Sequence, residues 1–323
     1  GVDKGDILKQ QIFDIAPDET SVSINTKCFA AALESFPILV DELASESTSA
    51  KSQDLSNRSY FGKYDRPEAN GVLNWYKSAK ELESFIRAMD FGEHPNLLVL
   101  PKVIIDGQVF AVQSAQINDG QSSSAVGQIS ELSDKQISVV TGDGVLGLTS
   151  FKELNGKIIT PGELQQKLSL SVGDQFQLLN DEELAELTTL GQKLAKSDHH
   201  WAYSLSNLDP VELPYSSNQN VTNSNEEVVS SLNVSIPESY ASMMGDDSIC
   251  QVMVSAFVML LAKLTRKHRF DIAYHSGPQS QSSDISSKII SDSSVLHVNL
   301  DLSESAKAII SEISNLMNHT EHL

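Results

Sequence analysis

The chain has 323 residues, more than one hydrophobic core usually organises, so the sequence predicts two or more structural units. Lys and Arg number 23 against 43 Asp and Glu, which gives a net charge of −20. Because nucleic-acid binding draws affinity from cationic side chains that release counterions, this charge argues against a nucleic-acid partner. No apolar run approaches the roughly 20 residues needed to cross a bilayer, so we expect no membrane partner.

Cysteine usage and targeting signals favour a cytoplasmic protein. Cys28 and Cys250 lie far apart in segments with helical patterns, so neither a disulfide framework nor a metal site is indicated. We find no signal-peptide pattern. Both ends look cut, because the chain lacks an initiating Met and its last helical pattern runs almost to the terminus. We therefore expect a fragment of a longer protein.

The first 57 residues predict a short strand, a helix and a linker. Apolar positions including Ile7 give residues 1–15 the pattern of a turn and a strand. Residues 17–20 start a helix that Pro37 is expected to kink. Residues 44–57 are rich in Ser, Thr, Glu, Lys and Gln, which is the composition of a linker.

The next segment predicts a small β-barrel. Ser78 and Glu81 form a capping box that starts a helix over 79–89. Asp106-Gly107 is a hairpin turn within a series of short strands. The expected strands cover 97–105, 109–117, 136–141 and 146–151. Their spacing favours a closed or half-closed antiparallel barrel, followed by a short helix from Thr160 and an acidic helix over 181–196.

The last segment, from about residue 198, predicts helices packed on strands. Its expected elements are strands over 227–236, 270–275 and 295–302, helices over 248–264 and from 306, and a Ser/Gln-rich loop over 277–287. This alternation is typical of an α/β unit.

Two motifs suggest chemistry that their context does not support. Residues 142–147 match G-x-G-x-x-G, but the strand-like segment 148–151 follows where a dinucleotide site needs a helix, so a glycine-rich turn is favoured. His199-His200 could open the H-H-x-x-x-D-G motif of condensation domains, but the Asp and Gly are missing, and a solvent-facing helix end is favoured. His275 and His297 lie near no recognisable nucleophile elbow.

Asp3 is the one candidate catalytic residue. In the turn Asp3-x-Gly5-Asp6 its carboxylate could orient a histidine and stabilise the imidazolium during proton transfer. A turn-forming aspartate with no catalytic role is the alternative, and on the residues alone it is favoured.

Several motifs in order resemble methionyl-tRNA-formyltransferase-like proteins. The first stretch, 1–28, resembles the end of the family's catalytic domain, with its D-x-G-x-I turn at Asp3. The second, 58–117, resembles the opening of the C-terminal OB-like domain. It carries Tyr60-Phe61-Gly62, Arg66-Pro67, Gly71-Val72-Leu73-Asn74-Trp75, Ile86-Arg87-Ala88 and Phe91-Gly92-Glu93-His94-Pro95-Asn96.

The resemblance implies a formyl transfer from 10-formyltetrahydrofolate to an amine. Asp3 would be the catalytic residue carried over, and Val2 with Asp3 would lie near the pterin. The family's Asn and His are absent from this chain, so we expect this fragment alone to be inactive. The acidic charge makes an acceptor other than tRNA more plausible.

The last segment resembles the second lobe of condensation domains from nonribosomal peptide synthetases. Residues 201–215 resemble their W-x-x-x-L and E-L-P segment, and 252–261 with 270–274 resemble a long helix and the next strand. The resemblance implies a multimodular hybrid synthetase, in which neighbouring carrier and activation domains are the partners. The acceptor amine would be tethered through phosphopantetheine on a carrier domain.

Together these observations predict a multi-unit α/β and β protein. It would combine a partial Rossmann-like segment, a small OB-like antiparallel barrel and an α/β half-domain of the chloramphenicol-acetyltransferase-like condensation type. The expected divisions are 1–45 for the catalytic-domain end, 46–57 for a linker, 58–180 for the OB-like domain, 181–197 for a connecting helix and 198–323 for the condensation-like half. The functional hypotheses are a synthetase-associated formyltransferase, a non-catalytic scaffold or docking module, and a degenerate acyl-transfer or condensation unit.

Overall fold

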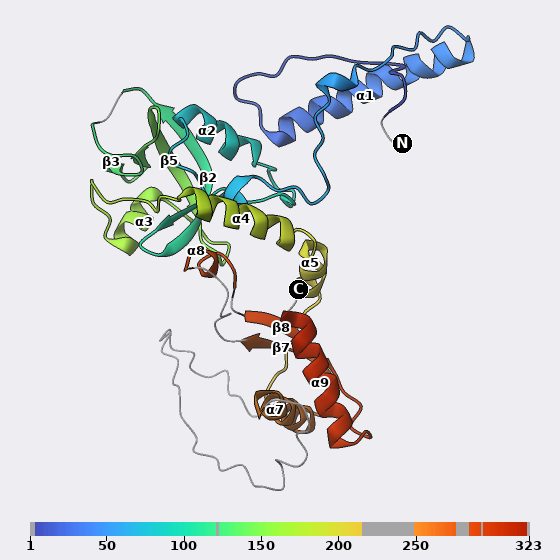
Figure 1. Cartoon of the computed structure of the whole chain (residues 1–323), viewed down its shortest axis with the longest axis vertical. Coiled ribbons are helices and arrows are strands. Elements are labelled where there is room, and N and C mark those ends of the chain that lie inside the picture. Colours follow the sequence, from blue (N-terminus) through green and yellow to red (C-terminus); the bar gives the residue numbers. More distant parts are fainter. Residues whose placement is uncertain (1–3, 121–122, 215–248, 276–283, 292, 322–323) are drawn as a thin grey trace. The chain divides into compact units, whose positions relative to one another are not determined.

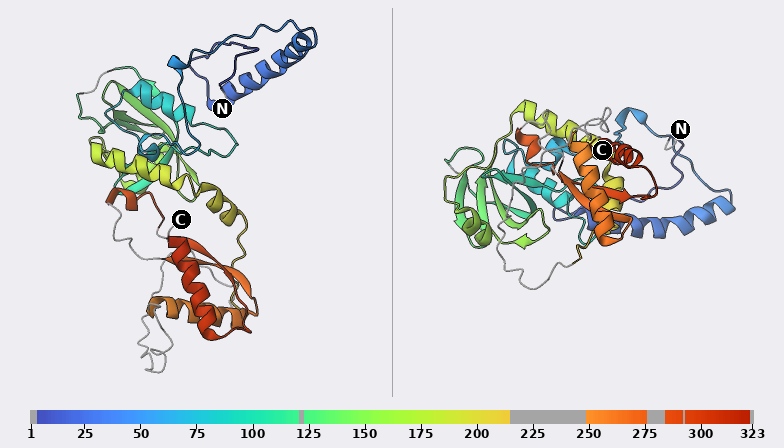
Figure 2. Two further views of the ribbon diagram at one scale, coloured as in Figure 1. Left: turned by 45° about the vertical axis from the view of Figure 1, so that its right-hand side comes forward. Right: turned by 90° about the horizontal axis from the view of Figure 1, so that it is seen from below.

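The computed structural model describes residues 4–120, 123–214, 249–275, 284–291 and 293–321, and it divides the chain into two units. The first unit runs from Gly1 to Lys196 and the second from Ser197 to Leu323. Figure 1 and Figure 2 show the elements of both. No helix among the described residues is long and apolar enough to span a membrane.

The first unit begins with an arm made of extended chain and one long helix. Helix α1 (Ser21–Ala44) starts at Thr20, whose side chain caps the Ser23 amide, so the predicted start is confirmed. The helix continues through Pro37, and none of its residues is buried.

The predicted strand and Rossmann-like segment are not seen in the described residues 4–45. An isolated antiparallel bridge joins Ile7 to Lys51, and the other described residues before α1 are irregular. A strand needs a partner along its length to satisfy its backbone groups, and within the described arm Ile7 finds one at a single position.

The centre of the first unit is an antiparallel sheet that curls into a half-barrel (Figure 1). Its strands follow the order β1-β2-β5-β4-β3, with β6 paired to β5. They are β1 (Lys102–Ile105), β2 (Gln108–Asn118), β3 (Ile129–Ser133), β4 (Gln136–Val140), β5 (Val145–Lys152) and β6 (Ile158–Ile159). The four expected strands are confirmed within a few residues, whereas β3 and β6 are additional.

Two hairpins confirm the turn predictions. Asp106 and Gly107 have φ angles of 49° and 70°, and they join β1 to β2 where Ile105 pairs with Gln108. Such positive φ values at both central residues suit a tight hairpin turn. The G-x-G-x-x-G segment forms the turn between β4 and β5 and then enters β5, as expected.

Helices close the open side of the sheet. Helix α2 (Ala79–Ala88) lies against β2 and β5 (Figure 2). It begins with the predicted capping box of Ser78 and Glu81. The Ser78 hydroxyl and amide hydrogen-bond to Glu81 and lower the pKa of its carboxyl. Helix α3 (Pro161–Leu168) begins with the predicted Thr160 cap. The core includes Leu73, Trp75, Leu82, Ile86, Phe110, Ile129, Ile137, Leu146, Leu148, Phe151, Leu164 and Phe176.

A strained turn attaches helix α4 (Asp181–Leu194) to this barrel. Ala69, Asn70 and Gly71 have φ angles of 51°, 49° and 82° in succession. The Ala69 amide donates to the Thr188 hydroxyl of α4 at 2.8 Å. Left-handed backbone at Ala69 and Asn70 costs energy, so it persists only because the surroundings impose it.

Lys102 of β1 also holds this turn. Its Nζ atom donates to the Asn70 carbonyl oxygen at 2.5 Å, and its carbonyl accepts from the Leu73 amide at 2.9 Å. Removal from water disfavours the charged ammonium and lowers the pKa of Lys102 to about 8.

The second unit contains a two-stranded sheet with two long helices. Strands β7 (Arg269–His275) and β8 (Ser293–Asn299) are antiparallel. Helices α7 (Ile249–Thr265) and α9 (Ala306–Glu321) bury Val258, Leu261, Ile309 and Ile313 with Phe270, Leu296 and Val298 of the strands. Helices α5 (Asp198–Ser206) and α8 (Asp284–Ser287) complete its described elements.

Most predictions for this unit are confirmed, with two qualifications. The expected strand over 227–236 lies outside the described residues. The expected loop over 277–287 is wrong at its end, because residues 284–287 form α8. The elements observed are of α/β character, but they do not identify a condensation-type half-domain.

We predict that Gly71→Ala destabilises the protein more than Gly107→Ala does. A Cβ atom at position 71 would lie 2.6 Å from the Leu100 carbonyl oxygen and 2.7 Å from Val99 Cγ2, whereas position 107 has open space. Both substitutions pay about 1–2 kcal/mol for left-handed backbone. The steric clash adds about 2 kcal/mol at position 71 only. Urea unfolding of the full chain measures both variants, and equal losses would contradict the packing at this turn.

We predict that Lys102 makes the free energy of unfolding rise between pH 8 and pH 10.5. The pKa of Lys102 is about 8 in the folded state and 10.5 in the reference state, so the unfolded chain binds more protons in this window. The rise attributable to Lys102 is about 1–3 kcal/mol. Lys102→Met should remove it, and Lys80→Met, an exposed site on α2, should not. Identical pH profiles of wild type and Lys102→Met in urea titrations would refute the assignment.

Candidate functional site

The sequence-predicted site residues Val2 and Asp3 lie outside the described residues. Their predicted roles in folate binding and proton transfer stay predictions. Among the described residues we consider three candidate functional arrangements. They are a loop at the end of α2, a polar face of the sheet, and two histidine pairs in the second unit.

The loop over residues 90–96 is held by one asparagine side chain. Asn96 Oδ1 accepts from the amides of Leu98 at 2.8 Å and Val99 at 3.1 Å. Its Nδ2 atom donates to the carbonyls of Met89 at 2.9 Å and Val99 at 2.7 Å. Because one carboxamide ties both ends of the loop together, it fixes the path of the residues between them.

This loop forms one wall of a hollow of about 440 Å³. Asp90, Glu93 and His94 from the loop line it, together with Lys152 of β5 and apolar residues of α2 and β2. Carboxylates, an imidazole and an ammonium therefore surround one concavity, which suits a ligand that carries both charge and apolar surface.

Arg87 connects the arm to the start of this loop. Its guanidinium is paired with Glu83 on the same helix, at 2.9 Å from Nε to Oε1, and this pair raises the pKa of Arg87. Nη1 donates to the Glu19 carbonyl at 2.6 Å, just before α1. The Ser21 hydroxyl donates to the Ala88 carbonyl. The arm is thus anchored next to residues 90–96 by groups from the Ile86-Arg87-Ala88 motif.

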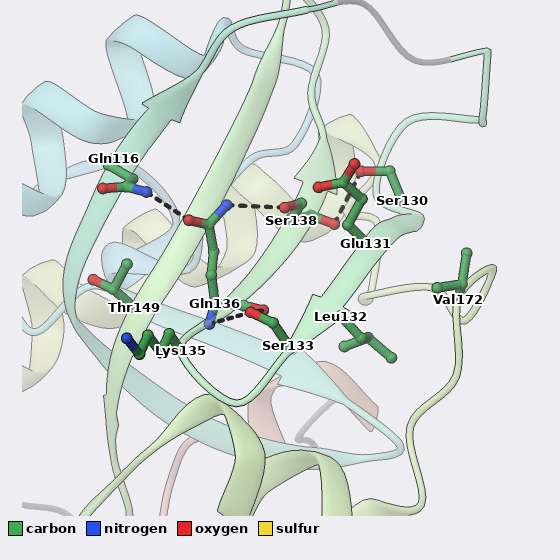
Figure 3. A pocket seen from close by; sticks show the side chains of 10 residues that line it. All are labelled: Gln116, Ser130, Glu131, Leu132, Ser133, Lys135, Gln136, Ser138, Thr149 and Val172. Atoms are coloured by element: carbon green, nitrogen blue, oxygen red, sulfur yellow. Dashed lines mark hydrogen bonds between the residues drawn. The ribbon is translucent and has the colours of Figure 1, made fainter.

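The outer face of the sheet carries a row of neutral polar side chains, which we call the polar platform (Figure 3). It consists of Ser114, Gln116 and Asn118 on β2, Thr149 on β5, and Gln136 and Ser138 on β4. Figure 3 shows Gln116, Gln136 and Ser138 joined in one chain of hydrogen bonds. A hollow of about 740 Å³ lies over this face and extends to β3 and Val172.

The sequence analysis missed the Asn96 clamp and the polar platform. Pro95-Asn96 carries a recognisable turn signal, so the loop could have been found. The polar residues at 114, 116 and 118 have the alternation of an outward strand face, but their partners on β4 are set by strand pairing.

The second unit brings two histidines into pairs that sequence spacing did not reveal. His297 Nδ1 lies 2.8 Å from Asp271 Oδ1 across the β7–β8 pair. His275 Nε2 lies 2.9 Å from the Ser293 hydroxyl. These pairs are at different positions along the two strands and form no triad. His199 and His200 lie on α5, as expected for a helical segment.

The described residues provide no cluster of three His, Cys, Asp or Glu side chains placed to hold a metal ion. The hollow beside the clamped loop and the hollow over the polar platform each combine polar and apolar lining residues, which suits an organic ligand.

Comparison with known proteins identifies the region that contains these features. Residues 67–168 match the family described as "Formyl transferase, C-terminal domain". Methionyl-tRNA formyltransferase from Idiomarina loihiensis is 30% identical over 162 residues, which cover 50% of this chain and 50% of that protein. The chain thus spans about half the length of the curated relatives it matches.

Two solved structures have a weak overall similarity to this chain. The N-formyltransferase from Helicobacter canadensis, solved with folinic acid and dTDP-3-aminofucose, has a TM-score of 0.37 at 19% identity and covers 46% of this chain and 51% of that one. HypX from Aquifex aeolicus has a TM-score of 0.38 at 13% identity and covers 54% of this chain and 29% of that one. Residues 67–168 are therefore similar to the C-terminal domain of formyl transferases, and half of the chain is similar to a methionyl-tRNA formyltransferase.

Proposed function

We propose that the chain is part of an enzyme that transfers a formyl group from 10-formyltetrahydrofolate to an amine tethered to a carrier domain. The match of residues 67–168 to the formyl transferase C-terminal domain is the observation that carries this proposal. The barrel and the clamped loop would position the acceptor, and the catalytic groups would come from the region around Asp3 and from sequence outside this chain.

The proposed formyl transfer needs no oxidant or reductant. The acceptor nitrogen attacks the formyl carbon, and the bond between that carbon and N10 of the folate breaks. The proton lost by the amine ends on N10, so the products are a formamide and tetrahydrofolate. Asp3 would orient the histidine that carries this proton, because its D-x-G sequence resembles the family's motif.

The acceptor class follows from charge and from the resemblance of the last segment. A net charge of −20 disfavours a tRNA acceptor, whose phosphates need cationic contacts. A phosphopantetheine-tethered amine on a neighbouring carrier domain needs fewer cationic contacts than tRNA and is therefore more compatible with the acidic chain. Activation domains of the same synthetase would be further partners. A non-catalytic scaffold and a degenerate condensation unit are the competing functions.

We expect the polypeptide that contains this chain to formylate a carrier-bound amine when supplied with 10-formyltetrahydrofolate. Intact-mass spectrometry of the carrier measures the gain of one formyl group. Asp3→Asn should lower the rate by about 10²–10⁴-fold, as for loss of a group in proton transfer. Asp6→Asn, an exposed carboxylate in the same turn motif, is the matched control. No transfer to any carrier-bound amine would favour the scaffold.

We also expect Asn96→Ala to lower kcat/KM for this transfer by at least about tenfold. Loss of the four hydrogen bonds would release the loop over residues 90–96, and small displacements of positioning groups reduce rates strongly. Asn155→Ala, in an exposed turn of the same domain, is the control. An unchanged kcat/KM in a folded Asn96→Ala variant would show that the loop does not position the acceptor.

A further inference from the structure

The polar platform differs from an ordinary solvated sheet face in its lack of charge. Its six side chains are all amides or hydroxyls, although one residue in five of the chain is charged. An outward face of an antiparallel sheet is usually polar, but surfaces normally rely on Lys, Glu, Asp and Arg. Charged side chains enter the hollow only beside the platform: Glu131 lies opposite Ser138 in the β3–β4 pairing, and Lys135 lines the hollow next to Gln136.

The platform side chains are held in place by one another. Gln116 Nε2 donates to Gln136 Oε1 at 2.5 Å, and Gln136 Nε2 donates to Ser138 Oγ at 2.9 Å. Asn118 Nδ2 donates to the same hydroxyl at 3.0 Å. Ser114 and Thr149 hydroxyls pair at 2.7 Å. Because these rotamers are already ordered, a ligand that hydrogen-bonds to them loses less conformational entropy.

Gly147 makes this arrangement possible. It lies on β5 between Gln116 of β2 and Ser138 of β4 in the pairing register. A Cβ atom at this position would lie 2.3 Å from Gln136 Nε2 and 2.9 Å from Asn118 Oδ1. The carboxamides can therefore extend over β5 only because residue 147 has no side chain. Gly147, the last glycine of the G-x-G-x-x-G segment, therefore makes room for the carboxamides and is not needed for the turn itself.

The shape and chemistry of the hollow limit its occupant. Carboxamides offer donors and acceptors together, which matches a ligand that contains amide groups. No aromatic side chain lines the hollow, so it lacks a stacking surface for a base. The hollow extends from β2 to β3, three strand spacings or about 14 Å, which suits an extended ligand. Lys135 at its border could pair with a single phosphate.

We propose that the polar platform binds the extended diamide arm of phosphopantetheine. This inference rests on the proposed carrier-bound acceptor, because that acceptor reaches the enzyme on such an arm. The two amides of the arm would hydrogen-bond to Gln116 and Gln136, and Lys135 would contact the phosphate at its carrier end.

Titration of the isotope-labelled full chain with D-pantetheine tests this proposal without formyl donor or carrier. We expect the side-chain amide signals of Gln116 and Gln136 to shift in nuclear magnetic resonance spectra. Gln136→Ala and Gly147→Val should each raise the Kd at least fivefold, and Gln166→Ala on the exposed face of α3 should leave it unchanged. Because position 147 is buried, the exposed Gln116→Ala provides a second variant that retains the fold.

The outcomes separate this proposal from the formyl transfer. Shifts at the platform that the platform variants abolish support the arm site, whether or not transfer is observed. Equal Kd values in wild type and Gln136→Ala would overturn it, as would shifts confined to other parts of the chain. Stronger shifts by triglycine or maltotriose than by pantetheine would also overturn it, since they would assign the platform to a peptide or a glycan.

Discussion

The first unit depends on one strained turn that two separate segments hold in place. Ala69, Asn70 and Gly71 adopt left-handed backbone that only glycine accepts at low cost. The turn persists because Thr188 of α4 accepts the Ala69 amide and Lys102 of β1 donates to the Asn70 carbonyl. It therefore joins the start of the barrel domain, its first strand and the helix that follows it.

The candidate sites lie on the framework that this turn stabilises. The Asn96 loop follows α2 and leads into β1, so its ends are fixed by elements of the core. The polar platform uses the outward positions of strands whose inward positions build the same core. In both places hydrogen bonds order the polar side chains, and Gln116, Asn118 and Gln136 remain at least partly exposed for contact with a partner.

Local signals account for the elements that the sequence predicted well. The capping boxes at Ser78 and Thr160 and the Asp106-Gly107 turn each act through neighbours within a few residues, so tertiary context was not needed. Strand β3 was missed because its sequence, Ile129-Ser-Glu-Leu-Ser, has few apolar positions and is recruited by pairing with β4. The strand near Ile7 was predicted from alternation but forms only one bridge among the described residues.

The sequence alone determined helix starts, tight turns, the formyltransferase resemblance and the acidic net charge, because these follow from composition and short-range motifs. Tertiary structure decided which distant side chains meet: Gln116 with Gln136, His297 with Asp271, and Lys102 with Asn70. The physical reason is that strand register and chain reversal place residues together at separations that no local rule encodes. The roles of Gly71 and Gly147 likewise became clear only when the atoms opposite each missing Cβ were known.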